Sequence, residues 1–533
     1  MKKVISIILT VVILCVSLLP AVSAATACTC DNVPIIYVRG KTPILPDKSK
    51  PASNSNHQIP YITGKELETY ITELAGLYLA SPVIGYSRME QKLAEIFAEE
   101  YKDYALDMNG NITNNSGIAP EFQWSKSAVK DNHKPSKTVT TYEQASAEIY
   151  KYYYIYDCRV DPFETADDLR EYIKTVKSVT GHSKVKILAR CYGANVVSAY
   201  FAKYGWSDIE DVVLYNPIMY GTDKLDCIFT GEIVVTQESI DYISENYIAD
   251  TEEDQTLKLL VDVLNKTGGF DFTNSKASDA INYCSPAILR ETYATCPGFW
   301  AMLSADAYEK AKNFVYETAY YGDEFTEKFA GIIKKTDNYH ENVRLKLDEI
   351  YADMRADGVD VYTIAKYGTQ LLPIMENPMV QADDTVSVTT QVPGTIAAPL
   401  GTSFGEAYME DAAARGVTKY ISPDKTIDVS GVSYRDTVWF VKDLVHDNFP
   451  KVFDLFIYKL LRSKGTFTIN SDKNYPQFME YKNDNGTETV KPITTADADD
   501  EQLDLAGDIR LFIQRLQAIV IRLLKKYIFG IVF

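Results

Sequence analysis

The chain has 533 residues, 46% of them hydrophobic, and a formal net charge of −19. This length exceeds one ordinary domain, so we expect one large domain with insertions or two domains. The acidic excess argues against binding to nucleic acid, whose phosphates must be neutralised by lysine and arginine.

The N-terminus has the pattern of a secretory signal. Lys2 and Lys3 precede an apolar run over residues 4–19, and small residues at 22–24 offer a cleavage site. This run is too short for a typical membrane span, so residues 1–24 predict a bacterial-type signal peptide. We expect an exported protein, extracellular or associated with the cell envelope. A lipoprotein with Cys28 as the lipidated residue is a second interpretation, but residues 25–27 lack the usual bulky aliphatic.

Cysteine usage gives a further expectation. Removal of the signal peptide takes Cys15 with it and leaves seven of the eight cysteines, so at least one thiol stays unpaired within a single chain. Cys28 with Cys30, and Cys284 with Cys296, are plausible disulfide partners in an oxidising compartment. No group of Cys and His has metal-ligand spacing. The sequence therefore predicts no metal and no cofactor.

The first part of the core is expected over 31–235, with a helical insertion at about 60–130. Strands are predicted at 33–41, 152–157, 184–190 and 209–217, and an amphipathic helix at 165–181 ends at a glycine. Strands that alternate with helices at this spacing predict a mostly parallel sheet with helices on both faces. The fold class is therefore α/β.

The second half of the chain continues this pattern after an interruption. Residues 236–350 are predicted to be helices and loops, which we interpret as an inserted helical cap. Strands return at 359–368 and 436–446, and a helix follows at 450–464. We assign 351–468 to the second part of the core. The polar segment 469–503 is predicted to be a linker.

The C-terminal segment, 504–533, predicts a basic amphipathic helix. Apolar residues recur at helical spacing from Ile509 to Tyr527, while arginines and lysines occupy the other face. Residues 508–529 could lie on anionic lipid as a peripheral membrane contact. The alternative, a helix docked on the body of the protein or self-associating, is equally consistent with the pattern.

A cysteine stands where a predicted strand turns into a helix, in Ala189-Arg190-Cys191-Tyr192-Gly193. A side chain at such a turn lies over the carboxyl edge of the sheet, beside backbone N–H groups that can bind an oxyanion. The G-x-S-x-G elbow of hydrolases has this geometry, and its small residues let strand and helix approach closely. We predict Cys191 to be a nucleophile; the alternative is a buried, inert cysteine.

The chain offers few bases to activate this thiol. Its histidines are His57, His133, His182, His340 and His446. Only His446 follows a late apolar strand, as the order nucleophile–acid–histidine requires. We predict His446 to be the general base.

Three blocks, 31–41, 152–223 and 420–464, resemble lecithin:cholesterol acyltransferase-like lipases of the α/β-hydrolase superfamily. The longest likeness runs through "YIYDCRVDPFETADDLREYIKTVKSVTGHSKVKILARCYGANVVSAYFAKYG". Cys158 stands where that family usually has tryptophan. Arg39 replaces the histidine of a His-Gly pair, and Arg190 with Cys191 replaces the His-Ser of the elbow.

The resemblance implies roles for further residues. The backbone N–H groups of Lys41 and Tyr192 would form the oxyanion hole. Arg39 and Arg190 are candidates to bind an acidic group of the substrate. For the carboxylate that orients His446, the likeness of the loop "SPDKTIDVS" favours Asp424. Asp384 in "ADDTVSV" is the alternative, and Asp428 is a third candidate.

These expectations give one leading hypothesis. It is a secreted acyl hydrolase or acyltransferase, acting on carboxylic esters, thioesters or lipid-like substrates through a Cys191–His446–Asp424 triad and a thioester intermediate. The alternative is a catalytically degenerate hydrolase fold that binds a lipid, glycan or peptide. A cysteine peptidase is a third possibility, for which no sequence feature marks a peptide cleft.

Overall fold

The computed structural model describes residues 30–51, 83–130, 138–236, 274–317 and 323–494, with Cys28 and scattered positions between 70 and 81 and at 239 and 242. The expected signal peptide (1–24) and C-terminal helix (504–533) lie outside these residues, as do the last part of the expected linker and most of 237–273.

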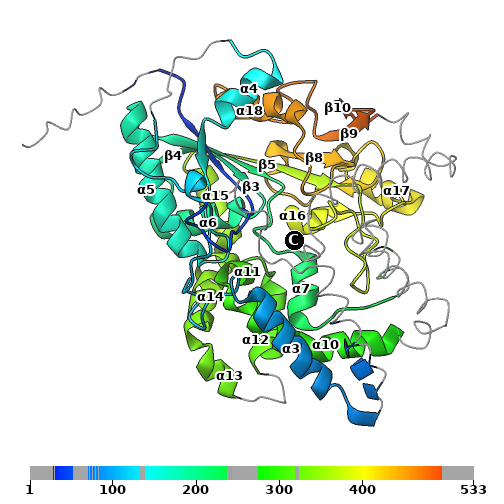
Figure 1. Ribbon diagram of the computed structural model, residues 1–533. Helices are drawn as coiled ribbons and strands as arrows, with labels where there is room; N and C mark the ends of the chain where they lie inside the picture. Colours follow the sequence, from blue (N-terminus) through cyan, green and yellow to red (C-terminus); the bar gives the residue numbers. More distant parts are fainter. Residues whose placement is uncertain are drawn as a thin grey trace, which may run out of the picture.

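The central element is an eight-stranded sheet (Figure 1) in the order β10-β9-β8-β5-β4-β3-β1-β2. All neighbours are parallel except β9 and β10. The predicted α/β class and mostly parallel sheet are therefore confirmed. The strands are β1 (Ile35–Val38), β2 (Tyr152–Tyr154), β3 (Val185–Arg190), β4 (Ile209–Tyr215), β5 (Asp360–Tyr367), β8 (Val438–Lys442), β9 (Phe478–Asp484) and β10 (Thr487–Pro492). A separate small pair joins β6 (Ile396–Ala397) and β7 (Ile427–Asp428).

Helices cover both faces of the sheet because the central strands are buried on both sides. Ile187 and Val212 belong to one apolar cluster, while their neighbours Leu188 and Val213 belong to another. The first face packs under α5 (Pro162–Thr180), α6 (Gly193–Tyr204) and α15 (Leu347–Ala356). The second packs under α4 (Tyr142–Ile149) and α18 (Asp454–Arg462). Alternate side chains of a strand therefore pack against different helix layers, as expected of a parallel sheet.

The ends of α5 follow from its sequence. Pro162 occupies the first helical position, and the side chain of Asp161 accepts a hydrogen bond from the backbone N–H of Phe163. The helix ends at Gly181, whose φ of 74° is left-handed. Proline at the start and glycine past the end are the usual boundary signals.

A second group of helices lies at one end of the sheet, in the lower part of Figure 1. None of the helices in the described part of the chain is long and apolar enough to cross a membrane. The group comprises α3 (Ser87–Tyr101), α7 (Asp223–Thr230), α10 (Asn274–Glu291), α11 (Pro297–Trp300), α12 (Ala305–Tyr316), α13 (Asp323–Lys328) and α14 (Ala330–Asn342). The remaining short elements are α16 (Val388–Gln391), α17 (Glu406–Ala414) and the 3-10 turns η2 (Pro120–Phe122), η3 (Tyr293–Thr295), η4 (Arg344–Lys346), η5 (Thr418–Tyr420), η6 (Arg435–Thr437) and η7 (Lys451–Phe453).

One fully buried arginine ties the insertion before α4 to the sheet. The guanidinium of Arg159 donates to both carboxylate oxygens of Asp157, and the shortest of these hydrogen bonds, from Nη2 to Oδ2, measures 2.6 Å. It also donates to the carbonyl of Tyr104 at 2.6 Å and to Oγ of Ser116 at 3.0 Å. A buried charge is tolerated only when it is paired and hydrogen-bonded, as here.

Two predicted boundaries are wrong. The cap was expected to run to 350, but α15 packs on α6 and β5 and therefore belongs to the helix layer of the sheet. The segment 469–503 was expected to be a linker, but it contains β9 and β10, which extend the sheet. Asn485 and Gly486 connect these strands with φ of 52° and 89°. An Asn-Gly hairpin turn needs such values, and this dipeptide was the overlooked signal.

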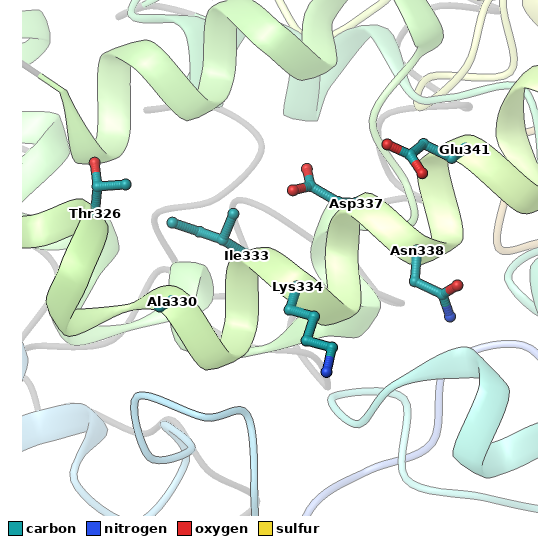
Figure 2. A pocket seen from close by; sticks show the side chains of 7 residues that line it. All are labelled: Thr326, Ala330, Ile333, Lys334, Asp337, Asn338 and Glu341. Carbon is teal, nitrogen blue, oxygen red and sulfur yellow. The ribbon is translucent and has the colours of Figure 1, made fainter.

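A hollow of about 420 Å³ lies along α13 and α14, and Figure 2 shows the side chains that line it. Asp337 and Glu341 project from successive turns of α14 beside it. Its lining contains none of the predicted site residues. The lining residues are Thr326, Ala330, Ile333, Lys334, Asp337, Asn338 and Glu341.

Candidate active site

Cys191 occupies the turn between β3 and α6 in a left-handed conformation, with φ of 52°. Its backbone N–H donates to the carbonyl of Tyr215 at the end of β4 (3.1 Å), and its carbonyl accepts from Ala194 in α6 (3.0 Å). A positive φ is unfavourable for a residue with a side chain and persists only where its surroundings fix it. The strand below and the helix above therefore determine where the half-buried thiol points.

Two glycines make room for this turn. A Cβ at Gly193 would lie 2.6 Å from the carbonyl oxygen of Val38 and 2.9 Å from that of Arg39. A Cβ at Gly40 would lie 3.0 Å from Cβ and 3.5 Å from Sγ of Cys191. The loop after β1 thus lies directly against Cys191. This close approach explains why small residues were predicted around the elbow.

His446 reaches the thiol from the loop after β8. Its Nε2 lies 3.0 Å from Sγ of Cys191, and its Nδ1 lies 2.7 Å from Oδ2 of Asp383. The backbone N–H of His446 also donates to the carbonyl of Asp383 at 2.7 Å. We call Cys191, His446 and Asp383 the Cys191 cluster. The predicted nucleophile and base are therefore in contact, although they lie 255 residues apart.

Asp383 is held in place by its own loop. Its carboxylate is fully buried, and its Oδ1 accepts from the backbone N–H groups of Thr385 (3.2 Å) and Val386 (2.9 Å). The other oxygen, Oδ2, is therefore directed at His446. The Nδ1–H group of His446 donates to this carboxylate, and that hydrogen bond fixes the ring so that Nε2 faces the sulfur.

The carboxylate on His446 is not the one predicted. Asp424 instead accepts from Ser422 (2.5 Å) and Thr426 (2.9 Å) and pairs with Lys442 at 3.3 Å. Its loop leads into β7, which belongs to the small pair with β6 and not to the main sheet. Asp424 therefore stabilises a turn, and the likeness of its loop to a family motif was misleading.

The two other acids also have different partners. Asp384, next to the correct residue, has φ of 77° and accepts from Oγ1 of Thr385 at 2.7 Å. Burial and the neighbouring charge of Asp383 raise the pKa of Asp384 to about 6. Asp428 accepts from Tyr408 at 2.7 Å. The signal for Asp383 was its place after β5, a strand of the main sheet.

The imidazole is almost completely buried, with 4% of His446 exposed. Burial lowers the pKa of His446, but the charge of Asp383, then that of Cys191, and hydrogen bonds to both raise it well above its ordinary value. The surroundings thus favour the imidazolium form. A positive ring between a carboxylate and a sulfur is the arrangement that supports a thiolate–imidazolium pair.

Two polar residues that the sequence analysis overlooked hold the loop of His446. Asn216, after β4, donates from Nδ2 to the carbonyl of His446 at 3.2 Å and lies 3.1 Å from its Nδ1. Lys366 of β5 is fully buried and donates to the carbonyls of His446 (2.9 Å) and Asn448 (2.7 Å). Burial, and after it the charge of Arg190, lower the pKa of Lys366 to about 7. Their position at the carboxyl edge of the sheet was the signal that could have found them.

The remaining predicted residues lie around the turn. Tyr192 caps the N-terminus of α6, where helix N–H groups lack partners within the helix, and exposed Lys41 follows Gly40. Arg190 donates to the hydroxyl of Tyr37 at 3.3 Å and packs over the ring of Phe449. Its described contacts are those of a packing residue beneath the His446 loop. Arg39 is half-buried, and its backbone joins the sheet edge.

Neither predicted disulfide is formed. The Sγ atoms of Cys28 and Cys30 are 3.2 Å apart, against about 2.05 Å in a disulfide bond. Cys284 and Cys296 are buried thiols in two different apolar clusters. The other cysteines of the core, Cys158 and Cys227, are likewise buried.

A cavity of about 800 Å³ lies beside the Asp383 loop. It shares Gln381 and Ser387 with that loop, and acidic side chains such as Asp223 and Asp226 line it. The Cys191 cluster itself does not line it.

Comparisons of this chain with protein-family models, with curated proteins and with solved structures find no match. The likeness to lecithin:cholesterol acyltransferase-like lipases remains a prediction from the sequence. Any assignment of function therefore depends on the geometry of the site.

Proposed function

We propose that this chain is an exported acyl hydrolase or acyltransferase of the α/β-hydrolase type, with Cys191 as nucleophile, His446 as base and Asp383 as the orienting acid. One observation carries the proposal: Sγ of Cys191, the ring of His446 and the carboxylate of Asp383 form a continuous line of contacts of 3.0 and 2.7 Å. Such a line is the recognised geometry of an activated nucleophile.

The order of these residues along the chain gives further support. Cys191 follows β3, Asp383 follows β5 and His446 follows β8, and the sheet places these strands near one another. Nucleophile, acid and histidine occur in this order in α/β-hydrolases. The left-handed turn at Cys191 is also what an elbow of that type requires.

The chemistry proceeds through a thioester. His446 takes the proton of the thiol at Nε2, and the thiolate attacks the carbonyl carbon of an ester. The backbone N–H groups of Tyr192 and Lys41 would stabilise the oxyanion. When the carbon–oxygen bond to the alcohol breaks, His446 gives the proton to the leaving alcohol. Water or a second alcohol, deprotonated by His446, then attacks the thioester and releases the acyl group, which restores the thiol.

The experiment is a panel of esters and thioesters of graded acyl length, assayed with the wild type and with Cys191→Ala. We expect turnover that the variant loses. Cys227→Ser is the matched control, because Cys227 is a buried thiol that donates to the backbone carbonyls of Glu232 and Ile374. Equal rates for wild type and Cys191→Ala would refute the proposal.

A thiol-directed electrophile tests the alternative of a binding protein without chemistry. If Cys191 reacts and His446→Gln slows that reaction, the site is chemically competent. If neither the esters nor the electrophile distinguishes Cys191 from the other thiols, the degenerate, ligand-binding interpretation is favoured.

A further inference from the structure

A second cysteine–histidine group lies at the opposite end of β3 from Cys191. It contains Cys28, Cys30 and His182, which we call the Cys28 cluster. His182 stands just before β3, which begins at Val185, while Cys191 follows the last residue of that strand. Since a strand rises about 3.3 Å per residue, the six residues of β3 alone separate the two groups by roughly 20 Å. The Cys28 cluster is therefore separate from the candidate active site.

The three side chains converge from segments that are far apart in the sequence. Sγ of Cys28 and Sγ of Cys30 are 3.2 Å apart, and Sγ of Cys30 is 3.7 Å from Nε2 of His182. All three ligand atoms lie within 4.8 Å of one another. The group is enclosed, because 7% of His182 is exposed and both cysteines are half-buried.

These separations can be compared with those around a metal ion. With bonds of about 2.3 Å to sulfur and about 2.0–2.1 Å to nitrogen, tetrahedral angles place two sulfurs about 3.8 Å apart and a sulfur and a nitrogen about 3.6 Å apart. The observed 3.2 and 3.7 Å lie near these values. The third separation, from Sγ of Cys28 to the His182 ring, is within 4.8 Å, so side-chain rotations would bring the three atoms onto one face of a tetrahedron.

We propose that Cys28, Cys30 and His182 form a binding site for a thiolate-preferring transition metal ion such as Zn²⁺. Two thiolates and an imidazole are the ligand set that this ion prefers, and water can supply the fourth ligand. Binding would release the two thiol protons while the neutral ring of His182 coordinates through Nε2. This site is independent of the proposed acyl transfer.

The position of the site indicates a structural role for the metal. The backbone N–H of Cys28 already donates to the carbonyl of Gly181 at 2.8 Å, which brings the start of the described chain against the end of α5. A metal ion bound there would link residues 152 positions apart in sequence. Cross-links that close long loops stabilise mainly by restricting the unfolded chain, so the bound ion should raise the melting temperature.

Zn²⁺ and Co²⁺ titrations of the reduced, purified protein test the proposal. We expect about one equivalent of Zn²⁺ to bind and to raise the melting temperature, and Co²⁺ to give thiolate charge-transfer and tetrahedral d–d absorption bands. His182→Ala and Cys30→Ser should each weaken binding at least tenfold. Cys227→Ser, the matched control outside the cluster, should bind as the wild type does.

Several results would overturn the proposal. They are absence of stoichiometric binding, binding that His182→Ala and Cys30→Ser leave unchanged, and loss of binding in the Cys227→Ser control. An intact mass lower by two hydrogen atoms that a reductant restores would identify a Cys28–Cys30 disulfide instead, and a lipid adduct on Cys28 would also exclude the site. Circular dichroism of each variant separates lost ligands from lost folding. Ester turnover, measured in parallel, reports on the proposed function separately.

Discussion

Two cysteine–histidine pairs lie at the two ends of one strand, and they differ in their third partner. At the carboxyl end of β3, His446 has a carboxylate on Nδ1 and a sulfur 3.0 Å from Nε2. At the other end, His182 lies 3.7 Å from the sulfur of Cys30, and a second sulfur lies beside it. A carboxylate stabilises a positive ring and so favours proton transfer, whereas a second sulfur adds a metal ligand.

The backbone around the two cysteine sites also differs. Cys191 is held in a left-handed turn between a strand and a helix, with glycines packed against it. Cys28 and Cys30 precede β1 near the start of the described chain. A cysteine beside a histidine therefore does not by itself define the chemistry of a site. The third side chain and the rigidity of the backbone determine whether the pair suits proton transfer or metal binding.

The largest expected effect separates the two pairs directly. Cys191→Ala should lower ester turnover at least about a thousandfold, because it removes the proposed nucleophile. Cys30→Ala should leave turnover within about twofold of the wild type. Steady-state kinetics on the best ester of the panel measure both. A comparable loss in the two variants would show that the pairs do not have separate roles.

The second-largest expected effect tests the carboxylate that contacts His446. Asp383→Asn should lower kcat at least about a hundredfold, since the amide cannot stabilise the imidazolium and favours the wrong orientation of the ring. Asp424→Asn is the matched control and should change kcat by less than about threefold. If Asp424→Asn proves the more damaging, the carboxylate seen on His446 is not the functional one.

Rigidity of the turn is tested by Gly193→Ala. The added Cβ would lie 2.6 Å from the carbonyl oxygen of Val38, so we expect a loss of about 1–3 kcal/mol in the free energy of unfolding and reduced turnover. Gly405→Ala is the control, because a Cβ there meets nothing within 4 Å. Urea denaturation measures both variants. Equal stability would mean that the loop after β1 adapts.

A pH effect follows from the charge on His446. Its pKa is raised in the folded protein, so its protonation stabilises the fold fully below the unfolded value of about 6.5. That contribution is lost as the pH rises through the folded value. Replacing Asp383 with Asn removes the main charge that raises this pKa. As the pH rises above about 6.5, the unfolding free energy of wild type should therefore fall more steeply than that of Asp383→Asn. Parallel curves would contradict this.

Much of the sheet and half of the site could be predicted from the sequence. Each strand of β1 to β5 and β8 is an apolar run next to a clear turn or helix signal, and the elbow follows from small residues around Cys191. His446 was found because only one histidine follows a late core strand. The short, polar β10 has no apolar run, and the overlooked signal for its pairing with β9 was the Asn485–Gly486 turn between them.

The orienting acid, Asp383, and the Cys28 cluster could not be predicted from such sequence signals. Asp383 and Asp384 are adjacent residues of the same type, and only the fold of the loop decides which faces His446. The Cys28 cluster combines two residues near the start of the chain with a histidine that follows α5. Ligand spacing along the sequence cannot reveal such a site, because folding and not spacing brings the side chains together.

The sheet order also has a consequence for how this protein is made. The contact between Cys191 and His446 spans 255 residues and joins the loops that follow β3 and β8. Contacts between distant parts of a chain form late during folding. The thiol of Cys191 is therefore synthesised 255 residues before its partner, and until His446 is in place the thiol lacks this contact.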